Sequence, residues 1–352
     1  MTRRYLKKTW SDWLNDPHTI SLMTSTAQPR PIRILNAEPL GYSPKAREVL
    51  NQLGQLTERE LSRVELVKEL SDYEVLVVRL AHQIDQEIID SGTRLEVIVT
   101  ATTGLDHIDL EYAQQRAITV LSLRGEYEFL RTISATSEHT MALLLALLRR
   151  IAPAFSAVQR GMWDRDAFRG NELDGKILGI IGLGRVGQKI AKYGLAFGME
   201  IIAFDPYRTD WMEGIRRASE LGEVTRSCDI LSLHVPLNAE TEGMIGADEL
   251  SELSPHAVLI NTSRGQLVDE DALVQALKER RLAGAAIDVM SNERDFHRRD
   301  QSPLLTFAKT HDNLLITPHI AGATHESMAK TEIFMALKLR DFFVGRPNLV
   351  EY

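Results

Sequence analysis

The alternation of short apolar runs with segments of helical period limits the fold of this chain more than any other feature. Strands that alternate with helices need crossover connections, and these join parallel strands. We therefore predict an α/β protein built on parallel sheets. The predicted strands are residues 32–35, 75–78, 95–100 and 118–121, followed by 177–182, 200–204, 230–234, 257–261, 284–289 and 314–317.

A long apolar helix, predicted at residues 132–154, separates the first four strands from the last six. The later strands and their helices fit a six-stranded doubly wound sheet of the Rossmann type. A chain of 352 residues exceeds the size at which one hydrophobic core keeps growing, so two domains are expected. Further helices are predicted at residues 43–53, 109–115 and 326–343.

Composition and charge exclude several classes of protein. The net charge of −8 and the scattered Arg and Lys residues argue against a nucleic-acid partner, which needs a dense basic face. The longest apolar run, residues 141–148, is far shorter than the ~20 residues that cross a bilayer, so no membrane partner is expected. Cys228 is the only cysteine, so no intrachain disulfide can form, and we expect a cytoplasmic protein. Residues 1–30 are interpreted as an N-terminal extension.

Three glycines, Gly182, Gly184 and Gly187, follow a predicted strand in the spacing G-x-G-x-x-G. The first permits a tight turn, the second lets the backbone approach a pyrophosphate, and the third allows a helix to pack closely on the strand. The N-terminus of that helix offers unpaired N–H groups to phosphates. Asp205 lies 18 residues after the third glycine, close to the ~20 expected for a carboxylate that holds a ribose 2′-OH. This carboxylate would repel a 2′-phosphate, so NAD is favoured over NADP, although Arg208 lies nearby.

Polar side chains that suit hydride transfer follow three of the later strands. Arg264, Glu293 and His319 each come after the end of a different strand, and in an open parallel sheet these ends line one crevice. A guanidinium can bind a substrate carboxylate through two hydrogen bonds, and an imidazole can exchange a proton near neutral pH. A carboxylate beside the imidazole fixes its tautomer and favours its protonated form. These residues predict hydride transfer between a nicotinamide and C2 of a 2-hydroxy or 2-keto acid.

Other histidines have plainer interpretations. His139, in the predicted long helix, is interpreted as a structural residue. His234 is either a cofactor contact or a hydrogen-bonded structural residue. His319, His325 and Glu326 lack the H-E-x-x-H spacing of a zinc site, so no metal is predicted.

Nine motifs along residues 32–345 appear in one order: GYSP, VVRL, TGLDHIDL, SEHTMALLLALLR, GMWDRDAFRGNELDGKILGIIGLGRVGQ, DILSLHVPLNAETEGMI, LINTSRGQLVDEDALVQAL, GAAIDV and ITPHIAGAT. In this the chain resembles the NAD-dependent D-isomer-specific 2-hydroxyacid dehydrogenase family. The resemblance implies a Rossmann-type NAD-binding domain (126–322) inserted in a smaller, flavodoxin-like substrate domain (31–125 and 323–352). It further implies an active site between the two domains and a homodimer built on the nucleotide domains.

The resemblance also implies roles for individual residues. The family's catalytic Arg, Glu and His fall on Arg264, Glu293 and His319. The cofactor contacts it implies are Gly182, Gly184, Arg185, Val186, Gly187, Asp205, His234, Pro236, Thr262, Asp288 and Gly322. The substrate contacts we infer with it are Arg79, Thr102, Thr103 and Gly104.

Two departures from the family pattern bear on the substrate. After the catalytic Glu the family commonly has Pro, whereas this chain has Arg294 and the charged stretch 295–300, so we expect a reshaped loop near the cleft. Phosphoglycerate-type members resemble GRAGTGVDN where this chain reads VTATTGLDH. Thr100 therefore replaces a phosphate-binding Arg, which disfavours a phosphorylated substrate.

The resulting prediction is an oxidoreductase, an NAD-dependent D-2-hydroxyacid dehydrogenase that works mainly as a reductase of a small 2-keto acid. Two alternatives stay open. One is a non-enzymatic NAD(H)-sensing protein of the same fold, and the other is a phosphoglycerate- or phosphite-type dehydrogenase. Retention of all three polar groups, Arg264, Glu293 and His319, argues for the enzyme.

Overall fold

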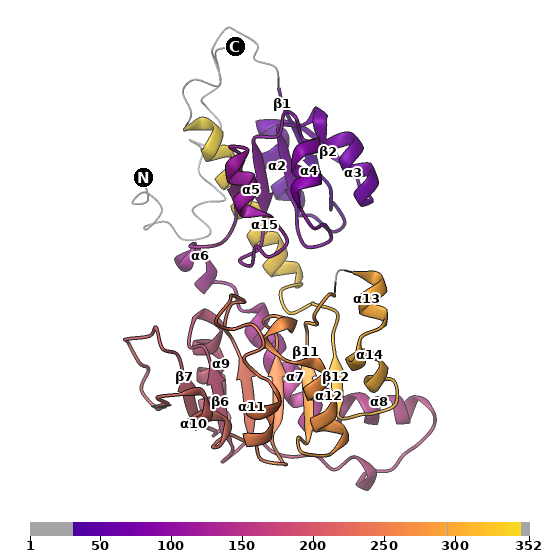
Figure 1. Cartoon of the computed structure of the whole chain (residues 1–352), viewed down its shortest axis with the longest axis vertical. Coiled ribbons are helices and arrows are strands. Elements are labelled where there is room, and N and C mark those ends of the chain that lie inside the picture. Colours follow the sequence, from indigo (N-terminus) through magenta and orange to yellow (C-terminus); the bar gives the residue numbers. More distant parts are fainter. Residues whose placement is uncertain (1–30, 294, 346–352) are drawn as a thin grey trace.

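The computed structural model of this chain describes residues 31–293 and 295–345. The predicted extension, residues 1–30, lies outside the described residues, as do Arg294 and residues 346–352 of the predicted substrate domain. The described chain forms two parallel sheets with their helices, and the two resulting lobes are stacked along the long axis of the molecule (Figure 1). The predicted α/β class is confirmed.

The sheet of the first lobe has five parallel strands in the order β2-β1-β3-β4-β5. Four of them, β1 (Ile32–Asn36), β3 (Val75–Val78), β4 (Val97–Thr100) and β5 (Thr119–Leu121), are the predicted apolar runs. The fifth, β2 (Gly54–Glu58), is not among the predicted strands, because GQLTE contains a single aliphatic residue. It is an edge strand that pairs with β1 alone and stays only partly buried, so it needs no apolar run.

The sheet of the second lobe has seven parallel strands, one more than predicted, in the order β12-β11-β10-β9-β6-β7-β8. The additional strand β8 (Ile215–Arg217) is a short, largely exposed edge strand with one apolar residue. The strand order reverses between β6 and β9, so a crevice opens beyond their carboxyl ends. The remaining strands are β6 (Ile177–Ile181), β7 (Glu200–Phe204), β9 (Ile230–Leu233), β10 (Val258–Asn261), β11 (Gly284–Ile287) and β12 (Leu314–Ile316).

The helix predicted over residues 132–154 is two helices, α7 (Ala135–Leu148) and α8 (Ile151–Gln159). Arg150 between them adopts the left-handed backbone, with φ of 52°. Pro153 explains the break, because proline inside a continuous helix clashes with the carbonyl four residues earlier, whereas the first turn of a new helix tolerates it. Within the described residues no single helix is long and apolar enough to span a bilayer. Tyr127–Leu148 and Ile151–Gln159 meet that test only as a pair, which is bent by 64°.

Helix α15 (His325–Val344) returns the chain from the second lobe to the first. It packs against α2 (Pro44–Leu53) and also contacts β4 and β5. Leu339 of α15 lies in one buried cluster with Val97 and Val99. Figure 1 shows α15, in yellow, beside the indigo and violet N-terminal elements. The first lobe thus combines two distant segments of the sequence, while the boundaries given above for the domains stay predictions.

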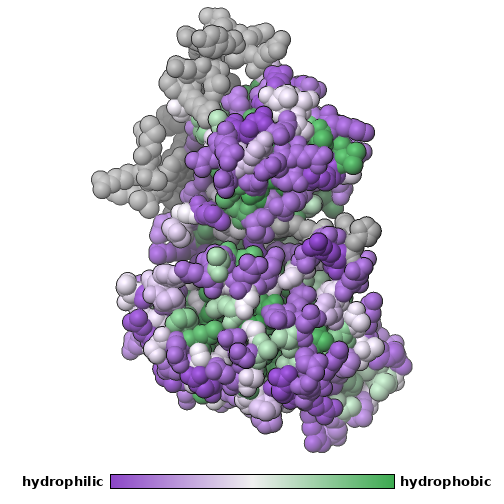
Figure 2. All heavy atoms as spheres, in the orientation of Figure 1, coloured by the Kyte–Doolittle hydropathy of each residue, from purple (hydrophilic) through white to green (hydrophobic). Residues whose placement is uncertain are grey.

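Hydrophilic side chains cover most of the visible face of both lobes (Figure 2). The second lobe packs α7 against β10, β11 and β12. The other α-helices among residues 31–293 and 295–345 are α3 (Arg63–Glu69), α4 (Gln86–Ser91), α5 (Leu110–Gln115), α6 (Tyr127–Arg131), α9 (Arg185–Ala196), α10 (Leu221–Thr225), α11 (Ala247–Glu252), α12 (Glu270–Lys278), α13 (Phe296–Asp300) and α14 (Pro303–Ala308). In the part of the chain that the structure describes, 3₁₀ turns occur at Leu70–Asp72, Asp166–Phe168 and Gly265–Leu267.

Candidate active site

The glycine loop between β6 and α9 has room for a phosphate group. Gly182 has φ of +88°, and a Cβ there would lie 2.6 Å from the carbonyl oxygen of His234. A Cβ at Gly187 would lie 2.1 Å from the carbonyl oxygen of Gly182. At Gly184, by contrast, a Cβ would meet no described atom within 4 Å, so the N-terminus of α9 faces open space. Two glycines therefore allow close packing and the third leaves a place that fits a pyrophosphate.

Asp205, directly after β7, lies against the glycine loop. Its Oδ2 accepts a hydrogen bond from the N–H of Leu183 (2.9 Å), and its Oδ1 accepts one from the N–H of Tyr207 (3.1 Å). Arg208 reaches the same loop, since its Nη1 donates to the carbonyl of Leu183 (2.8 Å) and its Nη2 to a carboxylate oxygen of Asp210 (2.8 Å). A carboxylate and a guanidinium thus flank the place that a dinucleotide ribose would take, and the carboxylate fits a free 2′-OH.

His234 lies at the crevice, directly after β9. Its Nε2 is 2.9 Å from Oγ of Ser232, and its buried Nδ1 has no hydrogen-bond partner among the described residues. Burial lowers the pKa of His234 to about 3, so this imidazole is neutral at physiological pH. A neutral ring with one unused nitrogen fits a contact to a polar group of a bound molecule, but it does not fit an acid–base role.

The other cofactor candidates of the second lobe make contacts of several kinds. The guanidinium of Arg185 donates to the carbonyl of Ile133 (3.3 Å), and burial lowers its pKa. Oγ1 of Thr262 lies 2.8 Å from Oγ1 of Thr140 in α7. Of the remaining candidates, Val186 is partly buried and Pro236 and Gly322 are exposed.

His319 and Glu293 form a hydrogen-bonded pair. Nδ1 of His319 bonds Oε1 of Glu293, while Oε2 of the same carboxylate accepts from the N–H of Met290 (3.1 Å). The loops that carry His319 and Glu293 each contain a residue with left-handed backbone: φ is 55° at His319 and 57° at Asn292. Non-glycine residues adopt this conformation at a cost in free energy. Because Nδ1 is taken by the carboxylate, Nε2 is the nitrogen left for proton exchange with a substrate.

Arg264 joins the two lobes. Its Nε lies 3.0 Å from Oδ1 of Asp106, and its Nη1 donates to the carbonyl of Ser263 (2.7 Å). A Cβ on Gly104 would lie 1.6 Å from Nη2 of Arg264, so the guanidinium packs directly on the backbone of the first lobe. Arg264 and Glu293 line one cavity of about 340 Å³, together with Asp106 and Gln83 of the first lobe. The structure therefore brings Arg264, Glu293 and, through Glu293, His319 to one place between the lobes.

Two acidic residues beside this cavity are absent from the sequence-based prediction. Asp106 orients Arg264, as described above. Glu270 accepts a hydrogen bond from the N–H of Ser291 (2.5 Å) and so holds the loop that carries Glu293, and burial raises the pKa of Glu270. Both residues stand within quoted motifs, TGLDHIDL and LVDEDAL, but neither follows the end of a predicted strand. Only the packing of loops from different strands makes them neighbours of the site.

The substrate candidates divide into two groups. Gly104 contacts Arg264, and the hydroxyl of Thr102 donates to the carbonyl of Gly104 (2.8 Å), while Thr103 is exposed. Arg79 is engaged within the first lobe, because its Nη2 donates to the carbonyls of Glu38 and Leu40 (both 2.8 Å) and its Nη1 lies 3.6 Å from a carboxylate oxygen of Glu332. These contacts join the 102–104 loop to Arg264, whereas the contacts of Arg79 lie within the first lobe.

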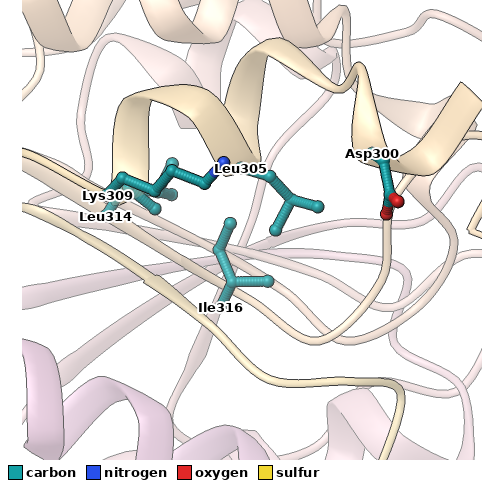
Figure 3. A pocket seen from close by; sticks show the side chains of 6 residues that line it. Asp300, Leu305, Lys309, Leu314 and Ile316 are labelled. Atoms are coloured by element: carbon teal, nitrogen blue, oxygen red, sulfur yellow. The ribbon is translucent and has the colours of Figure 1, made fainter.

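A larger cavity, of about 680 Å³, lies elsewhere, at the outer edge of the second sheet. Figure 3 shows Leu305 of α14 and Ile316 of β12 on its walls, with Asp300 to one side. None of the candidate site residues lines it. Among the residues that the structure describes, no group of three or more His, Cys, Asp or Glu side chains is placed to hold a metal ion.

Comparison with known proteins decides the family. Residues 141–321 match the family model described as "D-isomer specific 2-hydroxyacid dehydrogenase, NAD binding domain". The chain belongs to this family. The predicted family is thereby confirmed, and so is NAD as the predicted cofactor.

Relatives span several substrates. The chain is 34% identical to the hydroxypyruvate reductase of Thermotoga maritima, over 81% of this chain and 90% of the relative. It is 35% identical to the D-3-phosphoglycerate dehydrogenase of Methanocaldococcus jannaschii over 89% of this chain, but it spans only 58% of that relative's length. The crystal structure of D-lactate dehydrogenase from Aquifex aeolicus, complexed with NAD and lactic acid, superposes with a TM-score of 0.77 at 29% identity, covering 91% of this chain and 97% of that one.

The depressed pKa of His234 predicts how folding stability depends on pH. The unfolded chain protonates this imidazole below its ordinary pKa of about 6.5, whereas the folded protein keeps it neutral down to about 3. Its contribution to stability is therefore complete above about pH 6.5 and is lost as the pH falls toward 3.

A variant tests this dependence, because the side chain of His234→Asn does not titrate. In urea unfolding at about pH 7, 5.5 and 4.5, we expect the stability difference between the two proteins to shift in favour of the variant as the pH falls, by about 1.4 kcal/mol per pH unit at most. A difference independent of pH would contradict a His234 that stays neutral in the folded protein.

Proposed function

We propose that this protein is an NAD-dependent D-2-hydroxyacid dehydrogenase that works mainly as a reductase of a small 2-keto acid. One observation carries the proposal: Arg264 and Glu293 line a single cavity between the lobes, and His319 is hydrogen-bonded to Glu293. This reaction needs a permanent positive charge, a proton donor and a carboxylate that orients the donor. The named activities of two relatives, hydroxypyruvate reductase and glyoxylate reductase, support the same class of substrate.

Arg264, His319 and Glu293 would each have a separate role in this reaction. When bound, NADH supplies the hydride that C2 of the keto acid receives. Arg264 binds the substrate carboxylate, and its bonds to Asp106 and to the carbonyl of Ser263 hold the guanidinium in one orientation before substrate arrives. His319 donates a proton from Nε2 to the carbonyl oxygen of the substrate, and in the oxidising direction it accepts that proton. Glu293 keeps the proton of the other nitrogen on Nδ1 and stabilises the charged ring.

The cofactor residues complete the proposal. The glycine loop, with Arg185 and Val186, would hold the pyrophosphate, and Asp205 the ribose hydroxyls. His234, Pro236, Thr262 and Gly322 would border the crevice for the nicotinamide half. Asp288, whose side chain is fully buried, would serve the cofactor there through the loop that it holds. Thr102, Thr103 and Gly104 would form the substrate loop, and Arg79 would shape it from within the first lobe.

Phosphoglycerate oxidation is the second candidate. Several relatives that are 33–36% identical to this chain are named D-3-phosphoglycerate dehydrogenase. Against it, Thr100 is fully buried, and its hydroxyl faces Thr102 (3.0 Å) and His107 (3.4 Å), so this position offers no cation to a phosphate. The non-enzymatic NAD(H) sensor and the phosphite-type enzyme have no observation of this kind in their favour.

A homodimer is part of the proposal. Helix α8 exposes Ile151, Phe155 and Val158, and the segment after it exposes Trp163, of whose surface 90% is accessible. Neighbouring exposed apolar side chains of this size support a protein interface. Arg150 pairs with Asp312 (2.6 Å), which places the start of α8 near β12 and the cavity at the edge of the sheet. We further propose a cytoplasmic protein without nucleic-acid or membrane partners.

The reaction itself can be tested with a panel of keto acids. Purified protein and NADH should consume at least one of glyoxylate, hydroxypyruvate, pyruvate and branched or aromatic 2-keto acids faster than 3-phosphohydroxypyruvate. His319→Ala should lower kcat by about 100- to 10,000-fold, because general acid catalysis is lost, with little change in NADH affinity. His256→Ala, an exposed histidine outside the site, is the matched control. Equal loss of NADH binding in His319→Ala would refute the acid–base role, and a silent panel would refute the reductase.

Cofactor choice is a separate prediction. A ligand at 100 times its dissociation constant stabilises the folded state by about 2.7 kcal/mol. Because Asp205 would repel the 2′-phosphate of NADP, equal concentrations of the two cofactors should give a larger thermal shift with NAD. Asp205→Asn removes the charge that repels a 2′-phosphate while Arg208 remains, so this variant should narrow or reverse the preference. Asp248→Asn, in an exposed part of α11, should leave it unchanged. A larger shift with NADP for the unaltered protein would contradict the role given to Asp205.

The dimer can be tested by light scattering. The chain has a mass of 39.6 kDa, so the proposal requires a particle of twice that mass. Phe155→Asp puts a charge into the proposed interface and should yield monomers, whereas Val64→Asp, equally exposed on α3 of the other lobe, should not. Monomeric wild-type protein at micromolar concentration would rule out a stable dimer.

A further inference from the structure

His139 of α7 contacts the loop that carries the proposed proton donor. Its ring is largely buried, and α7 packs against β10, β11 and β12. Nε2 of His139 lies 3.0 Å from Oγ1 of Thr317 and 3.3 Å from Oδ1 of Asp288. Thr317 follows β12 directly and precedes His319 by two residues. His139 of α7 thus reaches the loop between β12 and α15.

The direction of these hydrogen bonds follows from the number of protons. A threonine hydroxyl has one hydrogen, and that of Thr317 goes to Oδ1 of Asp288 (2.6 Å). Oγ1 of Thr317 can therefore only accept from His139. Nε2 of His139 carries the proton, and it donates toward Thr317 and Asp288.

Asp288 in turn accepts hydrogen bonds from several residues of the loop after β12. Its side chain is fully buried, and its Oδ1 accepts from the N–H of Ile320 (2.9 Å) and its Oδ2 from the N–H of Ala321 (2.7 Å). Its main-chain carbonyl accepts from the N–H of His319 (2.8 Å). Burial alone would raise the pKa of Asp288, but hydrogen bonds from His139, Thr317 and the two amides outweigh it, and the pKa is lowered. A charged carboxylate therefore organises residues 317–321.

The backbone conformation of His319 depends on these hydrogen bonds. Its φ of 55° lies in the left-handed region, which costs a non-glycine residue of order 1 kcal/mol and persists only where surrounding bonds enforce it. Those bonds are the ones that Asp288 makes on both sides of His319. The direction in which the His319 ring projects depends on them, and so does its alignment with Glu293.

We propose, on the basis of the function proposed above, that His139 is a positioning residue: acting through Thr317 and Asp288, it fixes the loop that holds His319 in line with the substrate. His139 touches neither substrate nor Glu293 in this role. An apolar side chain could fill the same space between α7 and β12. It could not donate a hydrogen bond to the buried carboxylate of Asp288. Losing one donor costs a buried carboxylate free energy, because water does not replace the bond.

The test compares three variants with the wild-type protein. His139→Leu removes the donor, and His139→Gln restores an N–H at a similar reach. His311→Leu removes a histidine in the same lobe that contacts Thr310 and Phe307, outside the site. The first measurement is amide hydrogen exchange of the segment with Ile320 and Ala321, and the second is kcat, KM and the isotope effect with 4-deuterated NADH on the best keto acid.

For His139→Leu we expect exchange at Ile320 and Ala321 to accelerate about tenfold, the change expected from one hydrogen bond. We expect kcat to fall about tenfold or more, KM to change little because Arg264 is untouched, and the isotope effect to rise because chemistry becomes slower. His139→Gln should recover most of both changes, and His311→Leu should show neither.

Three outcomes would overturn the proposal. They are unchanged exchange in His139→Leu, faster exchange without a change in kcat, and faster exchange spread over the whole lobe, which would mean general loosening. If the wild-type protein reduces no keto acid, the function proposed above fails. The exchange measurement then still decides whether His139 holds the loop.

Discussion

The parallel direction of all seven strands in the second sheet is the constraint on which the rest of the site depends. Carboxyl ends of parallel strands meet along one edge, so the loops after β6, β9, β10, β11 and β12 become neighbours although they are far apart in sequence. Gly182, His234, Arg264, Asp288 and His319 stand on these five loops. The reversal of strand order between β6 and β9 opens the crevice for the dinucleotide at the same edge.

Close backbone contacts and buried carboxylates give these loops their shapes. A Cβ on Gly265 would lie 2.0 Å from the carbonyl carbon of Met290, so the turn with Arg264 rests directly on the loop with Glu293. Glu270 and Asp288 are satisfied mainly by backbone N–H groups and neighbouring hydroxyls. Burying a carboxylate without such donors is costly, so each loop keeps the conformation that supplies them. The same packing brings the guanidinium of Arg264 against the first lobe.

Sequence-based expectations succeeded where one period or one motif carries the information. Buried central strands are continuous apolar runs, so they were predictable, whereas the edge strands β2 and β8 contact the sheet on one side and need no such run. The apolar sequence of α7 and α8 concealed a break that Pro153 marks. In the site, strand ends pointed to Arg264, Glu293 and His319, whose roles stay proposals. Asp106 and Glu270 have no signal of this kind, because their importance comes from contacts made across loops and lobes.

By itself the sequence determined the α/β class, the family and the dinucleotide motif, because strand alternation and the glycine spacing are local properties of the chain. Tertiary structure alone decided that Asp106 pairs with Arg264, that Arg79 turns toward Glu332, and that His139 reaches the loop of His319. These contacts join residues separated by long stretches of chain. Their partners are set by how helices and loops pack on the two sheets, which no local pattern encodes.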